Sequence, residues 1–381
     1  MKTEKHFGMP YFDTYSSGTV AGSGNQMFFC PEDPSRILTG RVYYRVQAGG
    51  RCGWSFLFSN TIDTTYDRGD RGHCNLICDQ WQILSASVGV TKTAEPAEEP
   101  GTLIPLTFGG SREKAVFPGG FFVSDRVEAD AAAGMYLCLQ ISFCGRMIPY
   151  HEETLLPVFR RAEDGQWFPC RQMPLASMVG CDRPVALRIG YLGDSITQGI
   201  GTEQNSYAHW NAVLSGMLGT DFAFWNLGLG FARASDAASD GAWLFRARQN
   251  DLVVLCLGIN DLLQTRDGEA LKRNLTETVR KLKAAGVRVV LQTVPPFDYD
   301  PELREIWHGV NRYLREELAA ETDACFDTVP VLCKSPEEDH IAAFGGHPNA
   351  VGCKKWAEAL FPLMRKVLDD ISAAKKSAVD E

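Results

Sequence analysis

The sequence lacks the features of a membrane protein and of a nucleic-acid-binding protein. Its 381 residues contain no apolar run near the roughly 18 residues that a membrane-spanning helix needs. Lys and Arg number 38 against 47 Asp and Glu, and the formal net charge of −9 argues against nucleic acid and anionic membranes as partners. Residues 1–13 include neither the apolar core nor the cleavage-site pattern of a secretory signal, so we expect a cytoplasmic protein.

Metal and cofactor motifs are also missing. The 12 cysteines form no Cys-x-x-Cys pair, and the group His73, Cys74 and Cys78 has no second pair at zinc-like spacing. His151-Glu152 lacks the second histidine of a zinc protease motif, and no complete G-x-G-x-x-G or P-loop is present. We therefore expect no metal, no cofactor, and reduced cysteines that pack as small apolar side chains.

The first half does contain many Gly, Pro and turn residues between short apolar runs. These runs have the length and composition of β-strands, and they cover residues 41–46, 55–59, 81–90, 103–108, 121–124 and 135–143. Short strands separated by turns predict an all-β sandwich or jelly roll over residues 1–180. The acidic, proline-rich stretch 91–101 is expected to be an exposed loop, and residues 181–184 the joint to the second half.

After residue 184, apolar strands alternate with amphipathic helices. The expected strands cover residues 185–192, 222–226, 252–257, 287–294 and 325–332. Helices are expected over 269–285, from Pro301 onward, and after His347, where Pro362 should kink the last helix. This alternation predicts a parallel sheet with helices on both faces, in an α/β domain spanning residues 185–375.

Four distinctive segments follow the expected strands. They are GDS at 193–195, NLGLG at 226–230, GIND at 258–261 and GGHPN at 345–349. The first three come directly after strands, and the fourth follows the fifth strand by a longer loop. Because ligands bind at the carboxyl ends of the strands in sheets of this kind, we expect the four segments to meet in one site.

The residue types in these segments suit acyl transfer. Ser195 lies just beyond a strand, at the start of a helical turn whose N–H groups favour developing negative charge. Its hydroxyl needs a neighbouring base to become a nucleophile, and His347 is the candidate. The Ser195 N–H, a backbone N–H in the turn from Gly228 to Gly230, and the Asn260 amide are candidate donors to the oxyanion of a tetrahedral intermediate.

In their order and placement, these segments resemble the sequence blocks of the SGNH (GDSL) hydrolase superfamily. The matching stretches are GDSIT at 193–197, NLGLG at 226–230, GIND at 258–261 and HPN at 347–349. The resemblance implies a three-layer αβα, flavodoxin-like SGNH domain. It also implies that Ser195 is the nucleophile, that His347 is the base, and that Gly230 and Asn260 complete the oxyanion hole.

The first half resembles the β-domain that precedes the SGNH domain in some two-domain carbohydrate esterases. The segments that carry this resemblance are LFSNTIDTT at 57–65 and FPGGFFVSDRV at 117–127. It implies that the substrate is a small-molecule or oligosaccharide ester. Whether the β-domain binds substrate, covers the cleft or makes a subunit contact stays open, as does the oligomeric state.

The sequence departs from the family pattern at the orienting acid. The family's usual block reads Asp-x-x-His, and the residue three before His347 is Phe344. Without that acid, the imidazole loses tautomer control but can still act as a general base. Two substitutes are open: a backbone carbonyl that accepts from the imidazole, which we favour, or Asp339 from the preceding loop.

A second departure concerns the oxyanion hole. The family's glycine usually falls five residues after the asparagine of the second block, and the residue five after Asn226 is Phe231. Either Gly230 has taken the role through a shifted turn, or the Phe231 N–H donates regardless of its side chain. The sequence leaves both readings open.

Three functions are compatible with these residues. The leading hypothesis is a serine esterase that hydrolyses small acyl esters, acetyl above all, on a carbohydrate. The alternative is a catalytically impaired carbohydrate-binding protein with a degenerate SGNH domain. A third is metal-assisted ester hydrolysis through His347, Asp194 and Asp261. In the leading hypothesis, these two carboxylates only hold the loops in position.

Overall fold

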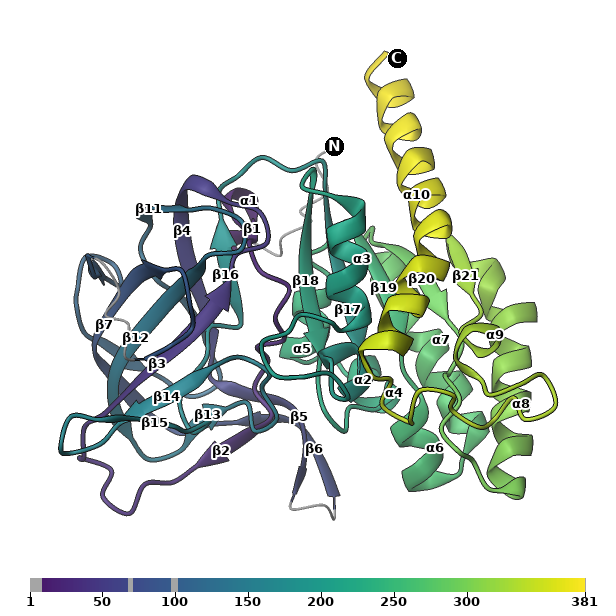
Figure 1. The fold of residues 1–381 in the computed structure, drawn as a ribbon, viewed down its shortest axis with the longest axis horizontal. Helices are drawn as coiled ribbons and strands as arrows, with labels where there is room; N and C mark the ends of the chain where they lie inside the picture. Colours follow the sequence, from purple (N-terminus) through teal and green to yellow (C-terminus); the bar gives the residue numbers. More distant parts are fainter. Residues whose placement is uncertain (1–8, 68–70, 97–101, 381) are drawn as a thin grey trace.

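The computed structural model describes residues 9–67, 71–96 and 102–380, and it divides into a β-rich half and an α/β half (Figure 1). No helix among these residues is long and apolar enough to cross a membrane. The cysteines are free thiols. The chain starts with a short helix, α1 (Tyr11–Thr14), which lies between the two halves.

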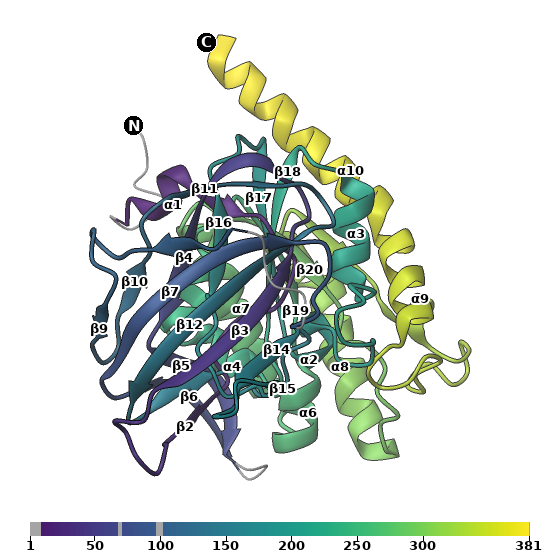
Figure 2. The same ribbon diagram turned by 60° about the vertical axis from the view of Figure 1, so that its left-hand side comes forward.

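Two antiparallel sheets form a sandwich in the β-rich half. The smaller sheet contains β1 (Ser16–Ser17), β16 (Met178–Cys181), β4 (Gly50–Ser59), β10 (Phe121–Val123) and β11 (Val127–Ala131). The larger sheet contains β15 (Trp167–Pro169), β14 (Val158–Arg161), β3 (Leu38–Arg45), β12 (Tyr136–Gly145), β7 (Trp81–Thr91), β8 (Ile104–Leu106) and β9 (Lys114–Val116). Figure 2 shows β3, β12 and β7 side by side. The expected β-sandwich is confirmed.

Strand β4 explains how the smaller sheet can be covered on both sides. Successive side chains of a strand point to opposite faces. Trp54, Phe56 and Phe58 belong to the core between the two sheets, whereas Leu57 belongs to the core of the α/β half. The smaller sheet therefore lies between the larger sheet and the α/β half.

Two further strand pairs extend from the sandwich. Strand β2 (Met27–Phe29) pairs with β13 (Ile148–Tyr150), and β5 (Thr61–Asp67) pairs with β6 (Arg71–Ile77) in a hairpin. On this hairpin, the Cys74 thiol lies 3.1 Å from the Ser239 hydroxyl, and Asn75 donates to the same oxygen at 3.0 Å. The hairpin thus contacts the α/β half.

The α/β half contains a five-stranded parallel sheet. Its order is β18 (Phe222–Gly228), β17 (Leu187–Gly193), β19 (Leu252–Cys256), β20 (Arg288–Gln292) and β21 (Ala324–Phe326). Since the first strand in the chain lies second, this is the flavodoxin-like order 2-1-3-4-5. The expected parallel sheet is confirmed.

Helices cover both faces of this sheet. On one face, α3 (Trp210–Leu218) packs against α10 (Ala350–Asp380), where the Trp210 and Trp356 rings stack with centroids 4.9 Å apart. On the other face pack α4 (Ala234–Ala238), α7 (Gly268–Ala284) and α8 (Pro301–Glu316). The remaining elements are α2 (Ser195–Gln198), α5 (Ala242–Ala247), α6 (Ile259–Thr265), η1 (Leu318–Glu321) and α9 (Val329–Leu332).

The predicted fifth strand, 325–332, is only partly correct. β21 ends at Phe326, and the last four residues of the range form α9 (Val329–Leu332). Pro330 explains the change, because proline cannot donate to a strand ladder but fits the first turn of a helix.

Pro362 lies inside α10, which is one uninterrupted helix.

Strand β7 extends into the predicted loop 91–101. Thr91 is its last residue, and Lys92 and Thr93 beyond it are exposed. Residues 97–101 lie outside the described part of the chain. The predicted loop is therefore seen only over 92–96.

The N-terminal residues join the second core rather than the first. Tyr11 and Phe12 of α1 are buried in the core of the α/β half, where Phe12 lies 6.1 Å from Trp225, centroid to centroid. Tyr11 also donates to the Ser55 carbonyl of β4 at 3.1 Å. A division at residues 180 and 185 stays our proposal for the domains, with α1 packed across it.

Candidate active site

The carboxyl ends of three parallel strands bring the predicted segments together. Gly193 at the end of β17 pairs with Gly228 of β18 and with Cys256 of β19. The Leu229 N–H then donates to the Gly193 carbonyl at 3.0 Å. The GDS, NLGLG and GIND segments therefore start at one edge of the sheet, as expected.

Ser195 and His347 meet at this edge. The Ser195 hydroxyl oxygen lies 2.7 Å from His347 Nε2, across 152 positions of sequence. Ser195 is the first residue of α2, whose N-cap Asp194 accepts the Ile196 N–H at 3.0 Å. As the first helical residue, Ser195 carries a backbone N–H without an intrahelical acceptor.

Burial determines the protonation of the imidazole. It lowers the pKa of His347 from its ordinary value of 6.5. The Phe297 ring contacts the imidazole edge-on, with centroids 5.7 Å apart and planes at 80°. At neutral pH His347 is therefore unprotonated, which is the form that can take a proton from Ser195.

Asp339 does not orient His347, and this sequence-based option is wrong. Its carboxylate accepts from Arg304 at 3.1 Å and from His308 at 2.7 Å, both on α8. Burial alone would raise the pKa of Asp339, but these two partners lower it. The carboxylate is thus ionised and already engaged away from the Ser195–His347 pair.

The second option, a backbone carbonyl, is not seen either. Across residues 9–67, 71–96 and 102–380, His347 hydrogen-bonds through its ring to Ser195 alone. Phe344, at the family's acid position, packs instead on α10: its ring lies 4.9 Å from the Lys355 ammonium, and a Cβ on Gly352 would lie 2.5 Å from the Phe344 Cβ. Packing against Phe297 and the hydrogen bond to Ser195 therefore hold the imidazole.

The backbone of His347 is in close contact with Gly201. A Cβ on Gly201 would lie 2.6 Å from the His347 carbonyl oxygen, and the Gly201 φ of +99° disfavours any other residue. The loop after α2 therefore contacts the backbone of the histidine that is hydrogen-bonded to Ser195.

Gly201→Ala is expected to lower kcat about 10²-fold, because a displacement of about 1 Å at a reacting group costs that much. Gly219→Ala is the matched control, since Gly219 has a similar φ of +90° and no heavy atom near its Cβ position. Ester turnover of both variants measures the effect. Equal rates in the two variants would show that the contact with His347 is unimportant.

The glycine turn differs from the prediction. The Gly230 N–H donates to the Gln198 side-chain oxygen at 2.6 Å. It therefore does not point to the oxyanion position, contrary to the expectation from the sequence. The Gly228 N–H likewise donates to Asn226 at 2.9 Å. Gly230 is therefore withdrawn as a donor, because a side chain of α2 already occupies its N–H.

Phe231 adopts the backbone conformation that a glycine would favour. Its φ is +62°, in the left-handed region. Because the Gly230 N–H is engaged by Gln198, the Phe231 N–H is the remaining one of the two readings that the sequence leaves open.

Asn260 lies at the start of α6 beside this turn. Its side-chain amide donates to the Ala232 carbonyl at 3.0 Å. An amide nitrogen carries two hydrogens, so this bond orients the group and leaves a second donor. Asn260 can therefore serve as an oriented hydrogen-bond donor.

Asp194 and Asp261 are buried and hold backbone segments. Asp261 accepts the Ala234 N–H at 2.9 Å, at the start of α4. Burial raises the pKa of Asp194 to about 7 and that of Asp261 to about 6. Among the described residues, they form no metal-type cluster with His347; the one such group is Cys52, Cys181 and Asp182. This set offers no support for the metal-assisted hypothesis.

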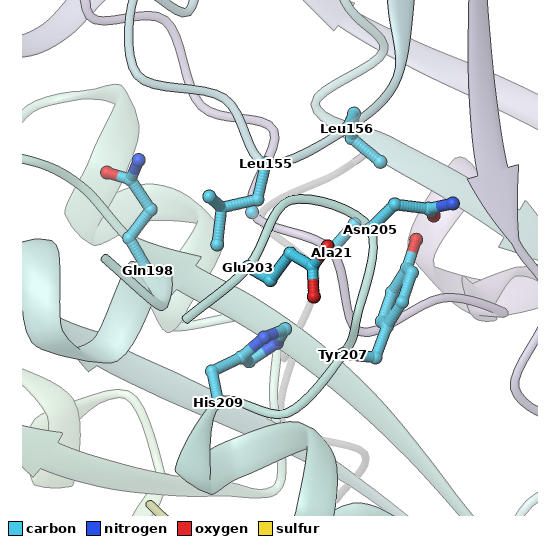
Figure 3. A pocket seen from close by; sticks show the side chains of 9 residues that line it. Ala21, Leu155, Leu156, Gln198, Glu203, Asn205, Tyr207 and His209 are labelled. Carbon is cyan, nitrogen blue, oxygen red and sulfur yellow. The ribbon is translucent and has the colours of Figure 1, made fainter. Parts of the chain in front are cut away.

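A small cavity of about 10 Å³ lies next to α2, between the two halves of the chain (Figure 3). Figure 3 shows Leu155 from the β-rich half facing Glu203 and His209 from the α/β half, with Gln198 at one side. His209 is buried and lies 3.3 Å from the Val20 carbonyl. Residues of the β-rich half thus lie next to α2, the helix that begins with Ser195.

Sequence reasoning missed Gln198, Gly201 and Phe297. Gln198 and Gly201 directly follow the GDSIT stretch, in the letters QGIG, so their place in the chain was a usable signal. Phe297 follows Pro295-Pro296 at the end of a predicted strand, and nothing in its local pattern points to His347.

A three-layer αβα domain with a Ser–His pair at the carboxyl edge of its sheet has the architecture of an SGNH-type hydrolase. Residues 191–355 match the model of the GDSL-like lipase/acylhydrolase family, a range that includes both Ser195 and His347. This part of the chain is a domain of that family, and its class of reaction is ester hydrolysis.

Solved structures of similar fold each cover just under half of the chain. They include a lipolytic protein of the G-D-S-L family from Desulfitobacterium hafniense (19% identity, 46% of this chain, 98% of that one, TM-score 0.40). Another is a carbohydrate acetylesterase family member from Sinorhizobium meliloti (20% identity, 48% of this chain, 99% of that one, TM-score 0.39). A third is a carbohydrate esterase family 3 protein from Talaromyces cellulolyticus (18% identity, 48% of this chain, 99% of that one, TM-score 0.36). A comparison with curated proteins finds no match.

Proposed function

We propose that the protein is a serine esterase that removes small acyl groups, acetyl first among them, from a carbohydrate or another small alcohol. The observation that carries this proposal is the 2.7 Å contact between the Ser195 hydroxyl and His347 Nε2. A degenerate binding protein has no need to keep this pair aligned. The contact therefore favours the enzyme over the impaired carbohydrate-binding alternative.

In the proposed reaction, His347 takes the hydroxyl proton while the Ser195 oxygen attacks the ester carbonyl. The carbonyl oxygen becomes an oxyanion, for which the Ser195 N–H, the Phe231 N–H and the Asn260 amide are the proposed donors. The protonated His347 then gives its proton to the leaving alcohol. Water repeats the same sequence on the acyl-enzyme and releases the acid.

Among the residues that the structure describes, no carboxylate is placed to stabilise the imidazolium. His347 is half-buried against Phe297, so the charge forms in a partly desolvated place. Because the proposed reaction uses a Ser–His dyad, the Ser195–His347 pair and the oxyanion donors must supply the rate enhancement.

The preference for a short acyl group rests on the resemblance to two-domain carbohydrate esterases and on the Phe297 ring beside the base. We expect kcat/KM to be highest for p-nitrophenyl acetate and to fall along the series acetate, butyrate, octanoate. An acetylated oligosaccharide, assayed by acetate release, tests the alcohol part. Preference for octanoate would contradict the short-acyl proposal, and unchanged activity with a chelator would exclude metal assistance.

A further inference from the structure

A segment of the β-rich half lies on the turn that follows β18. Within residues 22–26, a Cβ on Gly24 would lie 2.7 Å from the Leu229 side chain. A Cβ on Gly230 would collide with the Gln26 amide. Only glycines permit this approach, so the turn is enclosed by a segment from the other half of the chain.

Gln198 connects the same turn to both halves. Its oxygen accepts the Gly230 N–H at 2.6 Å, and its nitrogen donates to the Glu153 carbonyl at 2.8 Å. Gln198 is 2% exposed and is the last residue of α2, three positions after Ser195. One side chain therefore joins the serine helix, the turn and the β-rich half.

Glu153 is itself fixed by Gln26. The Gln26 amide donates to the Glu153 carboxylate at 2.8 Å, and the Glu153 N–H donates back to the Gln26 side chain at 3.1 Å. Both belong to the β-rich half, from stretches 127 positions apart. This reciprocal pair gives Gln198 a rigid acceptor.

A buried ion pair anchors the segment 22–26. Asp63 of β5 pairs with Arg246 of α5, and their side chains are 0% and 1% exposed. The same carboxylate accepts the Asn25 N–H at 2.9 Å. The segment is thus tied to the α/β half directly beside Gln26.

We infer that Gln198 is a positioning residue through which the β-rich half sets the Gly230–Phe231 turn for catalysis, an inference that rests on the proposed function. By accepting the Gly230 N–H, Gln198 fixes the Leu229–Gly230 peptide, and with it the backbone of the turn directly before Phe231. Oxyanion donors act through such preorganisation. The β-rich half is then part of the active site's support and not an independent module.

Gln198→Leu tests the inference, because leucine keeps the volume and removes both hydrogen bonds. We expect kcat for p-nitrophenyl acetate to fall about 10- to 100-fold, with KM within about 3-fold, since the turn acts on the transition state. Binding of phenylboronic acid, which forms a tetrahedral adduct with an active serine, should weaken by a similar factor.

Gln204→Leu is the matched control. Gln204 also donates across the two halves, to the Leu156 carbonyl at 2.9 Å, but within the described residues no hydrogen bond joins it to the turn. Its kinetic constants are expected to equal those of the wild type. A loss of unfolding temperature common to both variants would report the interface, whereas the kcat loss should be confined to Gln198→Leu.

Gln26→Leu repeats the test from the β-rich half and serves if Gln198→Leu does not fold. It should lower kcat in the same direction, and the double variant should lose little more than Gln198→Leu alone, because both belong to one network. Equal kcat in Gln198→Leu and Gln204→Leu, or unchanged boronate binding, would overturn the inference while leaving the esterase intact. A wild type without turnover would overturn both.

Discussion

Ser195→Ala is expected to lower kcat for p-nitrophenyl acetate by about 10⁴-fold or more, because removal of a nucleophile that works with its base abolishes the covalent route. The hydroxyl is the group hydrogen-bonded to His347, and no other hydroxyl contacts that imidazole within the described residues. The fold should be unaffected, since Asp194 caps α2 through Ile196 and not through the Ser195 side chain.

Ser206→Ala controls for the loss of a serine hydroxyl on the loop that follows α2. Its oxygen donates to the Glu203 carbonyl at 2.7 Å, on the loop that follows α2. Activity of this variant should equal that of the wild type. If Ser195→Ala kept a tenth or more of the wild-type rate, another group would have to be the nucleophile.

His347→Ala is expected to lower kcat about 10³- to 10⁴-fold, because the hydroxyl loses its proton acceptor. Added imidazole should restore part of the activity, since the space vacated beside Ser195 can admit a free base. Absence of rescue together with a rate near wild type would show that His347 is not the base.

The pH dependence of the wild type follows from the same histidine. A base works unprotonated, so kcat/KM is full above its pKa and falls as the pH drops through it. Burial without a carboxylate partner lowers the pKa of His347, so the acid limb should lie below pH 6.5. A limb at or above pH 7 would point to a nearby carboxylate that the described residues do not show.

The place of the site was predictable because it depends on strand order. Once three strands are parallel and adjacent, the residues after Gly193, Gly228 and Cys256 must lie at one edge. The family blocks then give Ser195 and His347 their proposed roles. Local sequence was sufficient for that much.

The hydrogen-bond partners were not predictable in the same way. Asp339 lies near His347 in sequence, but it bonds Arg304 and His308, which an independent helix brings to it. Gly230 looked like a free donor because nothing local shows that Gln198 accepts its N–H. Such competition is decided by tertiary packing, which a pattern of glycines and strands does not contain.

The contact between the two halves was likewise invisible in the sequence. Gly24 lies on Leu229, about 200 positions away in the chain, and Asp63 pairs with Arg246. The different sequence patterns of the two halves suggested separate modules. Apolar periodicity indicates which residues form each core, but it does not indicate which polar groups connect the two halves. The structure joins the halves directly behind the catalytic turn.

The central claim is that Ser195, activated by His347 without an acidic partner, is the nucleophile. The most direct test is treatment of the wild-type protein with a fluorophosphonate, followed by intact-mass measurement and peptide mapping. The account predicts one adduct per chain, on Ser195, with labelling lost in Ser195→Ala and strongly slowed in His347→Ala. An unlabelled wild type, or an adduct on any other residue, would contradict it.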